Sequence, residues 1–272
     1  MTTWRDAPPQ ILQPIGPLAR AFGLLRGGVL VAVVFGGLAV LLLVRLIEWP
    51  LFRMKRPLTP WITQGVCRAA LFILGIHYRV HGHPLGRMGA VVANHSSWLD
   101  IFALNACQRV YFVAKAEVAG WVGIGWLARA TGTVFIRRDP REAAAQKALF
   151  EQRLKAGHRL LFFPEGTSTD GRHVLHFKST LFSAFFNGGL GREMRVQPVS
   201  VIYRAPAGED PRFYGWWGDM TLGPHLMAVL SRWRQGEVEV VFHAPVRVED
   251  FASRKALAAH CEQEVRSALS FE

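Results

Sequence analysis

A histidine and an aspartate, five residues apart, are the side chains of this sequence best suited to chemistry. His95 and Asp100 lie in the string Asn-His-Ser-Ser-Trp-Leu-Asp, directly after the apolar run 90–93, which predicts a buried strand. In α/β proteins ligands bind at the C-terminal edge of such strands. An aspartate a little over one helical turn later can reach back to the imidazole, fix its tautomer and raise its basicity. We therefore predict that His95 is a general base oriented by Asp100.

The same string allows two other interpretations. Asn94 or Ser96 could cap a helix and leave Asp100 in solvent. Ser96 or Ser97 could instead be the nucleophile of a hydrolase. The chain has no Gly-x-Ser-x-Gly elbow, and both serines are too close to His95 in sequence for good geometry on the same ring. The hydrolase interpretation is therefore disfavoured, and the helix cap stays open.

Two further segments could bind an anion or a polyol. In the run Phe-Pro-Glu-Gly-Thr, residues Glu165, Gly166 and Thr167 form a turn after another predicted strand, and glycine there can expose backbone amides. A strand predicted at 132–136 brings Arg137 and Arg138 to its end, where guanidinium groups can hold a phosphate. An ordinary strand-to-loop turn and a solvated basic strand end remain the respective alternatives.

Strands and helices alternate from residue 76 onward. The patterns predict strands at 76–80, 90–93, 109–114, 132–136, 159–163, 196–203 and 237–248, and helices at 101–106, 141–156, 180–186 and 253–269. This alternation predicts an α/β fold with a mostly parallel central sheet covered by helices.

Residues 1–76 are predicted to form a membrane-associating segment before an α/β domain at 77–272. The run 27–44 carries no charge and is close to the minimum length for crossing a bilayer. It predicts a hydrophobic helix at about 27–47, followed by a second, amphipathic helix at about 61–76. A membrane helix or helical hairpin is favoured over a signal peptide, because the run starts late and lacks a small-residue cleavage pattern. A buried core helix is the remaining alternative.

The net charge and composition limit the classes of partner that the protein is expected to bind. The formal net charge of +12 favours anionic lipids, phosphorylated substrates or nucleic acid. No nucleic-acid motif is present, so we expect no nucleic-acid partner. The three cysteines are far apart, and no acid or cysteine joins His77, His81 and His83, so we expect neither disulfides nor a metal site.

Four motifs, taken in order, resemble the glycerolipid acyltransferase family, typified by 1-acylglycerol-3-phosphate acyltransferases. They are Asn-His-x-Ser-x-x-Asp, Gly-x-x-Phe-Ile-x-Arg, Phe-Pro-Glu-Gly-Thr and Val-x-Pro-Val, between Tyr78 and Val201. The resemblance implies direct acyl transfer from acyl-CoA or acyl-carrier protein, without a covalent enzyme intermediate and without a further cofactor. It makes His95 the base for a lysolipid hydroxyl and Asp100 its partner.

The resemblance also assigns the residues that hold the substrate. Arg137 and the turn 165–167 would hold the acceptor's head group, and Asn94 and Lys178 join the substrate-binding set. The family's Phe-Lys-x-Gly string is here Phe-Lys-Ser-Thr, at 177–180, so its glycine is missing. This departure bears on the local backbone path and on the identity of the acceptor.

The combined expectation is a membrane-bound O-acyltransferase of lipid biosynthesis, on the inner or plasma membrane with its catalytic domain on the cytoplasmic face. The first acceptor is 1-acyl-sn-glycerol 3-phosphate, which would give phosphatidate. A phosphate-free lysolipid such as lyso-ornithine lipid is the alternative. A non-catalytic membrane-binding protein and a lipid serine hydrolase are weaker alternatives, and the oligomeric state is left open.

Overall fold

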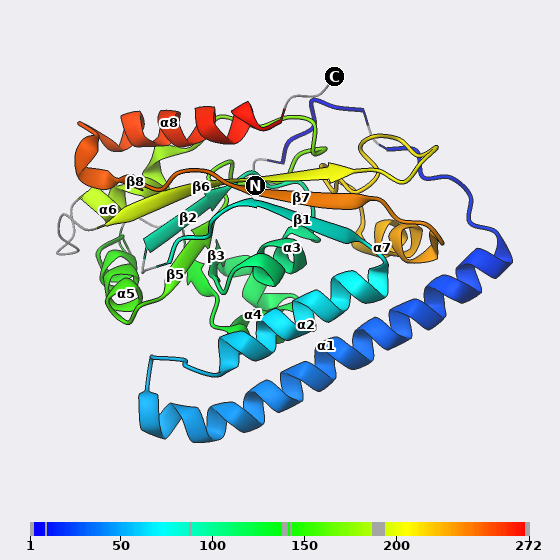
Figure 1. Cartoon of the computed structure of the whole chain (residues 1–272), viewed down its shortest axis with the longest axis horizontal. Coiled ribbons are helices and arrows are strands. Elements are labelled where there is room, and N and C mark those ends of the chain that lie inside the picture. Colours follow the sequence, from blue (N-terminus) through cyan, green and yellow to red (C-terminus); the bar gives the residue numbers. More distant parts are fainter. Residues whose placement is uncertain are drawn as a thin grey trace.

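The computed structural model describes residues 3–8, 10–86, 89–137, 141, 143–186 and 194–269. Within these residues the chain forms one eight-stranded sheet in the order β1-β7-β6-β2-β5-β3-β4, with β8 beside β6 (Figure 1). The strands are β1 (His77–Gly82), β2 (Gly89–Ala93), β3 (Tyr111–Lys115), β4 (Val134–Ile136), β5 (Arg159–Phe162), β6 (Arg195–Arg204), β7 (Glu237–Phe242) and β8 (Val246–Arg247).

The sheet is mostly parallel, as predicted. Strand β6 runs antiparallel to β7 and β8, and the other neighbouring pairs are parallel. Strand β2 lies between β5 and β6, and all five of its residues are buried. A strand covered on both faces reads as a continuous apolar run, which is why Gly-Ala-Val-Val-Ala lacks alternation. The turn after β2 therefore opens at the C-terminal edge of the sheet.

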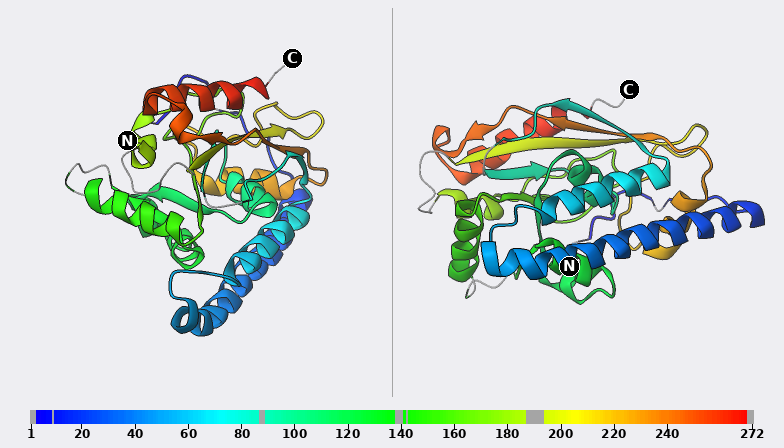
Figure 2. Two further views of the ribbon diagram at one scale, coloured as in Figure 1. Left: turned by 60° about the vertical axis from the view of Figure 1, so that its left-hand side comes forward. Right: turned by 60° about the horizontal axis from the view of Figure 1, so that its bottom comes forward.

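Helices cover both faces of the sheet (Figures 1 and 2). One face packs against α2 (Thr59–Leu74), α3 (Asp100–Cys107) and α7 (Leu222–Ser231), and the other against α5 (Ala143–Lys155), α6 (Ser183–Phe186) and α8 (Arg254–Ser267). Along β2, Val91 and Ala93 enter the first core, and Ala90 and Val92 enter the second. The short helices η1 (Ala116–Gly120), α4 (Ile124–Thr131), η3 (Ser179–Phe182) and η4 (Val248–Asp250) complete the connections.

The N-terminal helix α1 (Pro17–Phe52) is longer than the predicted 27–47. It runs along the α/β domain and contacts α2, α7 and α4 (Figure 2). By length and composition it could cross a membrane. Large apolar side chains remain exposed on α1, α2 and the η1–α4 segment, and we call this set the apolar face: Leu24, Leu25, Leu43, Leu46, Ile47, Trp49, Trp61, Phe72, Trp121 and Trp126.

The turn between α1 and α2 is held by a buried carboxylate. Glu48 accepts hydrogen bonds from the backbone N–H of Leu58 at 2.7 Å and from the hydroxyl of Thr59 at 2.7 Å, and it pairs with Arg45 at 3.1 Å. Acceptors at a helix N-terminus satisfy N–H groups that have no partner inside the helix. The helical hairpin is thus fixed as one unit.

Further elements differ from the sequence predictions. The strand predicted at 237–248 is divided into β7 and β8. The sequence patterns do not predict helices α4 and α7. Gly223 and Pro224 are typical of a loop, but both lie at the start of α7, where proline is tolerated in a helix. The helix predicted at 180–186 is a 3-10 turn followed by the four-residue α6.

Candidate active site

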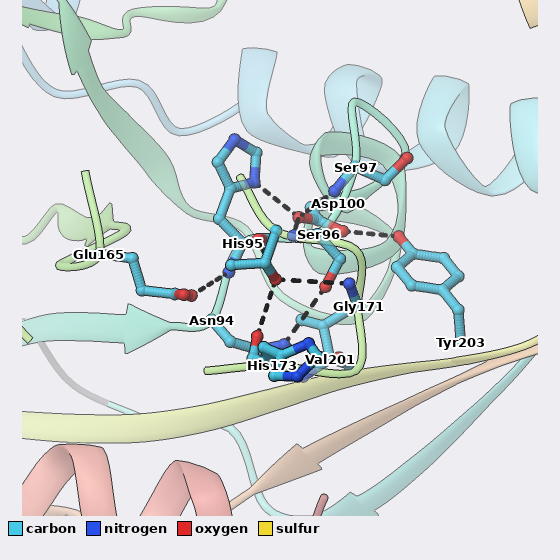
Figure 3. Close-up of polar contacts among 11 residues, drawn as sticks. Asn94, His95, Ser96, Ser97, Asp100, Glu165, Gly171, His173, Val201 and Tyr203 are labelled. Carbon is cyan, nitrogen blue, oxygen red and sulfur yellow. Dashed lines mark hydrogen bonds and ion pairs between the residues drawn. The ribbon is translucent and has the colours of Figure 1, made fainter. Parts of the chain in front are cut away.

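The imidazole of His95 is hydrogen-bonded to Asp100, as the spacing predicts. His95 Nδ1 lies 2.7 Å from Asp100 Oδ2 (Figure 3). Asp100 is the first residue of α3, and the tight turn 94–99 returns its carboxylate to the ring. Since a carboxylate accepts at Nδ1, the ring carries its proton there and keeps the Nε2 lone pair for a substrate. The His95 side chain is 23% exposed and that of Asp100 is fully buried, so the imidazole can be reached from outside and the carboxylate cannot.

Three further donors hold the Asp100 carboxylate in place. The backbone N–H groups of Ser96 and Ser97 donate to Oδ2 at 2.8 and 3.1 Å. The hydroxyl of Tyr203, on β6, donates to Oδ1 at 2.8 Å. Hydrogen bonds to the charged form stabilise a buried carboxylate. Asp100 therefore accepts backbone N–H groups at the start of α3 and also orients the His95 ring. It is buried, unlike the solvent-exposed aspartate of the helix-cap interpretation.

An aromatic ring covers one face of the base. Phe163, directly after β5, stacks on His95 with the ring centroids 4.1 Å apart and an interplanar angle of 12°. The π face of an aromatic ring attracts a cation, so this contact favours the protonated form of the imidazole. It also restricts the imidazole to one plane.

Glu165 contacts the backbone of the turn that carries His95. Its Oε1 accepts the backbone N–H of His95 at 2.7 Å, and its Oε2 accepts that of Leu175 at 2.8 Å. The residue is 1% exposed, and burial, together with the charge of Asp100, raises the pKa of its carboxyl to about 8 against the pull of these two N–H groups. Glu165 therefore positions the backbone of His95. In the same turn Gly166 has a φ of 73°, and Thr167 is half-buried.

The remaining predicted site residues occupy different places. The amide of Asn94 is 1% exposed and bonds both backbone groups of Val201, at 2.8 and 2.9 Å, so it joins β2 to β6. Arg137 is exposed after β4, and the half-buried Lys178 donates its backbone N–H to Pro164 at 3.0 Å. Counted along its motif, the arginine of Gly-x-x-Phe-Ile-x-Arg is Arg138, which lies outside the described residues.

The two serines of the motif do not face a substrate. Ser96 and Ser97 are both completely buried. The hydroxyl of Ser96 lies 3.4 Å from the Asn94 amide, and that of Ser97 has no hydrogen-bond partner. A nucleophile must be accessible to its substrate. This placement speaks against the serine-hydrolase interpretation.

Sequence reasoning missed Tyr203 and Phe163. Tyr203 lies on a strand whose alternation marks it only as inward-facing, and Phe163 is the first residue of the Phe-Pro-Glu-Gly-Thr motif, for which the sequence predicts no role. The alternation of side chains along β6 was the available signal. Tyr203 lies on the same face of the strand as Val199 and Val201, which pack into the core beside α3.

Comparison with known proteins assigns the family. The family model described as Acyltransferase matches residues 77–202. A lyso-ornithine lipid O-acyltransferase of Rhodobacter capsulatus is 64% identical over 90% of this chain and 89% of the relative. The chain belongs to the acyltransferase family. A 1-acyl-sn-glycerol-3-phosphate acyltransferase of Neisseria gonorrhoeae is 30% identical over 69% of this chain and 71% of the relative.

A solved structure agrees with this assignment. The crystal structure of a 1-acyl-sn-glycerophosphate acyltransferase from Thermotoga maritima superposes with a TM-score of 0.63 at 25% identity, covering 93% of both chains. This acyltransferase is thus an O-acyltransferase whose partners include membrane lipids, and its long apolar helix accords with membrane association.

Proposed function

We propose that this acyltransferase transfers an acyl group from acyl-CoA or acyl-carrier protein to the hydroxyl of a lyso-ornithine lipid. The observation that carries the proposal is the 64% identity to the Rhodobacter capsulatus enzyme over nearly the whole chain. A second lyso-ornithine lipid O-acyltransferase, from Rhizobium meliloti, is 35% identical over 77% of this chain and 75% of the relative. The phosphate-free acceptor thus replaces 1-acyl-sn-glycerol 3-phosphate as the first choice.

The reaction follows from the placement of one base. His95 Nε2 takes the proton of the acceptor hydroxyl as its oxygen attacks the thioester carbonyl of the donor. The tetrahedral intermediate collapses, the carbon–sulfur bond breaks, and the thiolate leaves with the proton from the imidazolium. Asp100 and Phe163 stabilise the imidazolium between these steps. No bond to the enzyme forms, and no further cofactor enters.

We place the head group of the acceptor at the edge of the sheet that carries His95. Arg137 and Lys178 supply positive charge for the carboxylate of the head group, Thr167 supplies a hydroxyl, and Gly166, whose N–H donates to the carbonyl of Phe163, gives the turn its shape. An ornithine head group carries a carboxylate, which a guanidinium can hold with two parallel hydrogen bonds. Asn94 and Glu165 take part indirectly by fixing the turn that bears His95.

The cellular location follows from the two substrates. The apolar face supports contact with a bilayer, where the lysolipid and the product reside. Acyl-CoA and acyl-carrier protein are cytoplasmic, so we place the catalytic domain on the cytoplasmic face of the inner membrane. The free cysteines Cys67, Cys107 and Cys261 suit a reducing compartment.

Acylation of 1-acyl-sn-glycerol 3-phosphate is the second candidate. It is favoured by the Neisseria gonorrhoeae relative and the Thermotoga maritima structure, both named for that acceptor.

A substrate panel tests the proposal. Purified full-length protein in mixed micelles is given labelled acyl-CoA or acyl-carrier protein with either lyso-ornithine lipid or 1-acyl-sn-glycerol 3-phosphate, and kcat/KM is measured for each. We expect the ornithine acceptor to exceed the phosphate acceptor at least tenfold, a difference of about 1.4 kcal/mol in transition-state binding. The reverse order would select the second candidate. A His95→Ala variant that still turns over would reject His95 as the base.

A further inference from the structure

Four basic side chains lie together at the edge of the sheet opposite to His95. We call Arg45, Arg56, Arg153 and His158 the basic cluster. His158 directly precedes β5, whereas His95 follows the C-terminal end of β2, so the cluster and the catalytic base lie at opposite ends of parallel strands. In Figures 1 and 2 the connection between α1 and α2 lies beside α5, and the cluster occupies this junction.

Two of the arginines meet at the end of α4. Arg56 Nη1 donates to the carbonyl of Ala130 at 2.7 Å, and Arg153 Nη2 donates to that of Gly132 at 2.6 Å. A Cβ at position 132 would lie 3.0 Å from Arg56 Cζ and 3.3 Å from Arg153 Nη2, so the two guanidinium groups are neighbours. The carbonyls at a helix C-terminus attract cations, which explains one hydrogen bond for each arginine. A guanidinium has five donors, and each of these hydrogen bonds uses one of them.

Several polar atoms of the cluster are buried without a partner. His158 is 4% exposed and stacks on Tyr111 with centroids 4.1 Å apart. Neither ring nitrogen has a hydrogen-bond partner of ordinary geometry among the described residues, although the backbone of Met54 lies near enough to favour the protonated ring. Arg153 is 9% exposed, and its Nε has no acceptor. Buried groups of this kind are rare in proteins and commonly mark the place of an ion or water.

The cluster also holds unbalanced positive charge. Glu48, the carboxylate that acts on Arg56, already accepts hydrogen bonds from the start of α2 and pairs with Arg45. Burial and the neighbouring guanidinium groups lower the pKa of Arg153 to about 10 and that of His158 to about 3. An anion with several oxygens would reduce this repulsion and accept the unused N–H donors.

We propose that the basic cluster binds the phosphate group of an anionic phospholipid. Exposed Trp49, Phe52 and Leu58 adjoin it in sequence and structure, and the guanidinium of Arg45 lies 4.8 Å from the Trp49 ring. Apolar side chains that enter a bilayer bring the connection 53–58 to the depth of the head groups, where tryptophan and arginine are favoured. Phosphate oxygens match the fork of a guanidinium. The bound lipid would fasten the helical hairpin to α5.

Lipid retention tests this proposal. Full-length protein in detergent micelles is mixed with equal amounts of phosphatidylglycerol and phosphatidylcholine, and the lipid retained is measured by native mass spectrometry. We expect wild type to retain phosphatidylglycerol in preference. Arg56→Gln and His158→Phe should each weaken its retention about tenfold, the effect of one hydrogen bond to a charged group. Phenylalanine keeps the ring stacked on Tyr111 and removes only the two nitrogens.

A matched control separates local binding from bulk charge. Arg254→Gln removes the same charge from the exposed start of α8, across the sheet from α1 and α2 (Figure 1), and should keep the preference. Arg56→Lys retains the charge and should keep most of the preference for phosphatidylglycerol. Acyl transfer in micelles without phosphatidylglycerol should stay at the wild-type level in all variants, which shows that they are folded.

Three outcomes would overturn the proposal. The first is equal retention of the two lipids by wild type. The second is an equal loss in Arg254→Gln and Arg56→Gln. The third is displacement of the lipid by inorganic phosphate at millimolar concentration, which would make free phosphate the ligand.

Discussion

The hydroxyl of Tyr203 donates a 2.8 Å hydrogen bond to Asp100 across 103 residues of sequence. Tyr203 lies on β6 and Asp100 at the start of α3, so this contact connects the sheet to the helix that carries the acid. Asp100 Oδ1 accepts this hydrogen bond, and Asp100 Oδ2 lies 2.7 Å from His95 Nδ1. The orientation of the His95 ring is therefore set partly by β6.

Tyr203→Phe should lower kcat about threefold to tenfold and leave KM nearly unchanged, because one hydrogen bond that orients Asp100 is lost. Tyr214→Phe is the matched control. Tyr214 is also buried and its ring centroid lies 5.6 Å from that of Tyr203, but its hydroxyl donates to Gln235 at 2.7 Å and not to Asp100. Steady-state kinetics in mixed micelles measures both variants. An equal fall in kcat for the two would show that Tyr203 contributes only to general stability.

Asp100→Asn should lower kcat about 100-fold to 10,000-fold, the range of a general base. An amide at this position can donate to Nδ1, which would place the imidazole proton on Nε2 and block proton abstraction. His173→Gln is the control, because it removes a second His–Asp pair, with Asp170 at 2.9 Å, whose histidine is 62% exposed. Single-turnover assays measure the chemical step directly. Near-normal turnover in Asp100→Asn would contradict the orienting role.

The contacts of the site that join residues close in sequence could be predicted from the sequence. The pairing of His95 with Asp100 depends on one strand end and one turn, both of which local pattern defines. The contact with Tyr203 depends on the register between β2 and β6, which pairs Val92 with Pro198 and cannot be read from either strand alone. The resemblance places Glu165 at the acceptor, and the parallel pairing of β2 with β5 brings its carboxylate beneath the backbone of His95, which neither strand reveals alone.

The length of α1 was underestimated for a related reason. The uncharged run covers only 27–44, but the helix extends over residues that carry charge, including Arg26 and Glu48. Arg26 donates to the carbonyl of Arg232 at 2.7 Å, and Glu48 accepts from the start of α2. These charges have tertiary partners, which the sequence of one helix does not reveal.

The buried carboxyl of Glu165 should make stability depend on pH. Its pKa, raised to about 8 from the ordinary 4.5, means that folding favours the protonated form. Its contribution to stability is therefore complete below about pH 4.5 and is lost as the pH rises through about 8. Glu165→Gln has no such titration. The unfolding midpoint of wild type should fall relative to that of the variant between about pH 5 and pH 9, measured by differential scanning fluorimetry, and parallel curves would contradict the raised pKa.

Two adjacent glycines of α1 provide a test of how closely the hairpin packs. A Cβ at Gly37 would overlap a γ-methyl of Val66 on α2, whereas one at Gly36 would meet nothing within 4 Å. Valine in a helix has little rotamer freedom, so the helices must separate to admit the extra methyl. Gly37→Ala should therefore cost about 1–3 kcal/mol of unfolding free energy, the usual penalty of overpacking. Gly36→Ala should gain about 0.5–1 kcal/mol from helix propensity alone. Thermal unfolding of the two variants in the same detergent gives the comparison, and a stabilising Gly37→Ala would show that α1 and α2 are not in direct contact at this position.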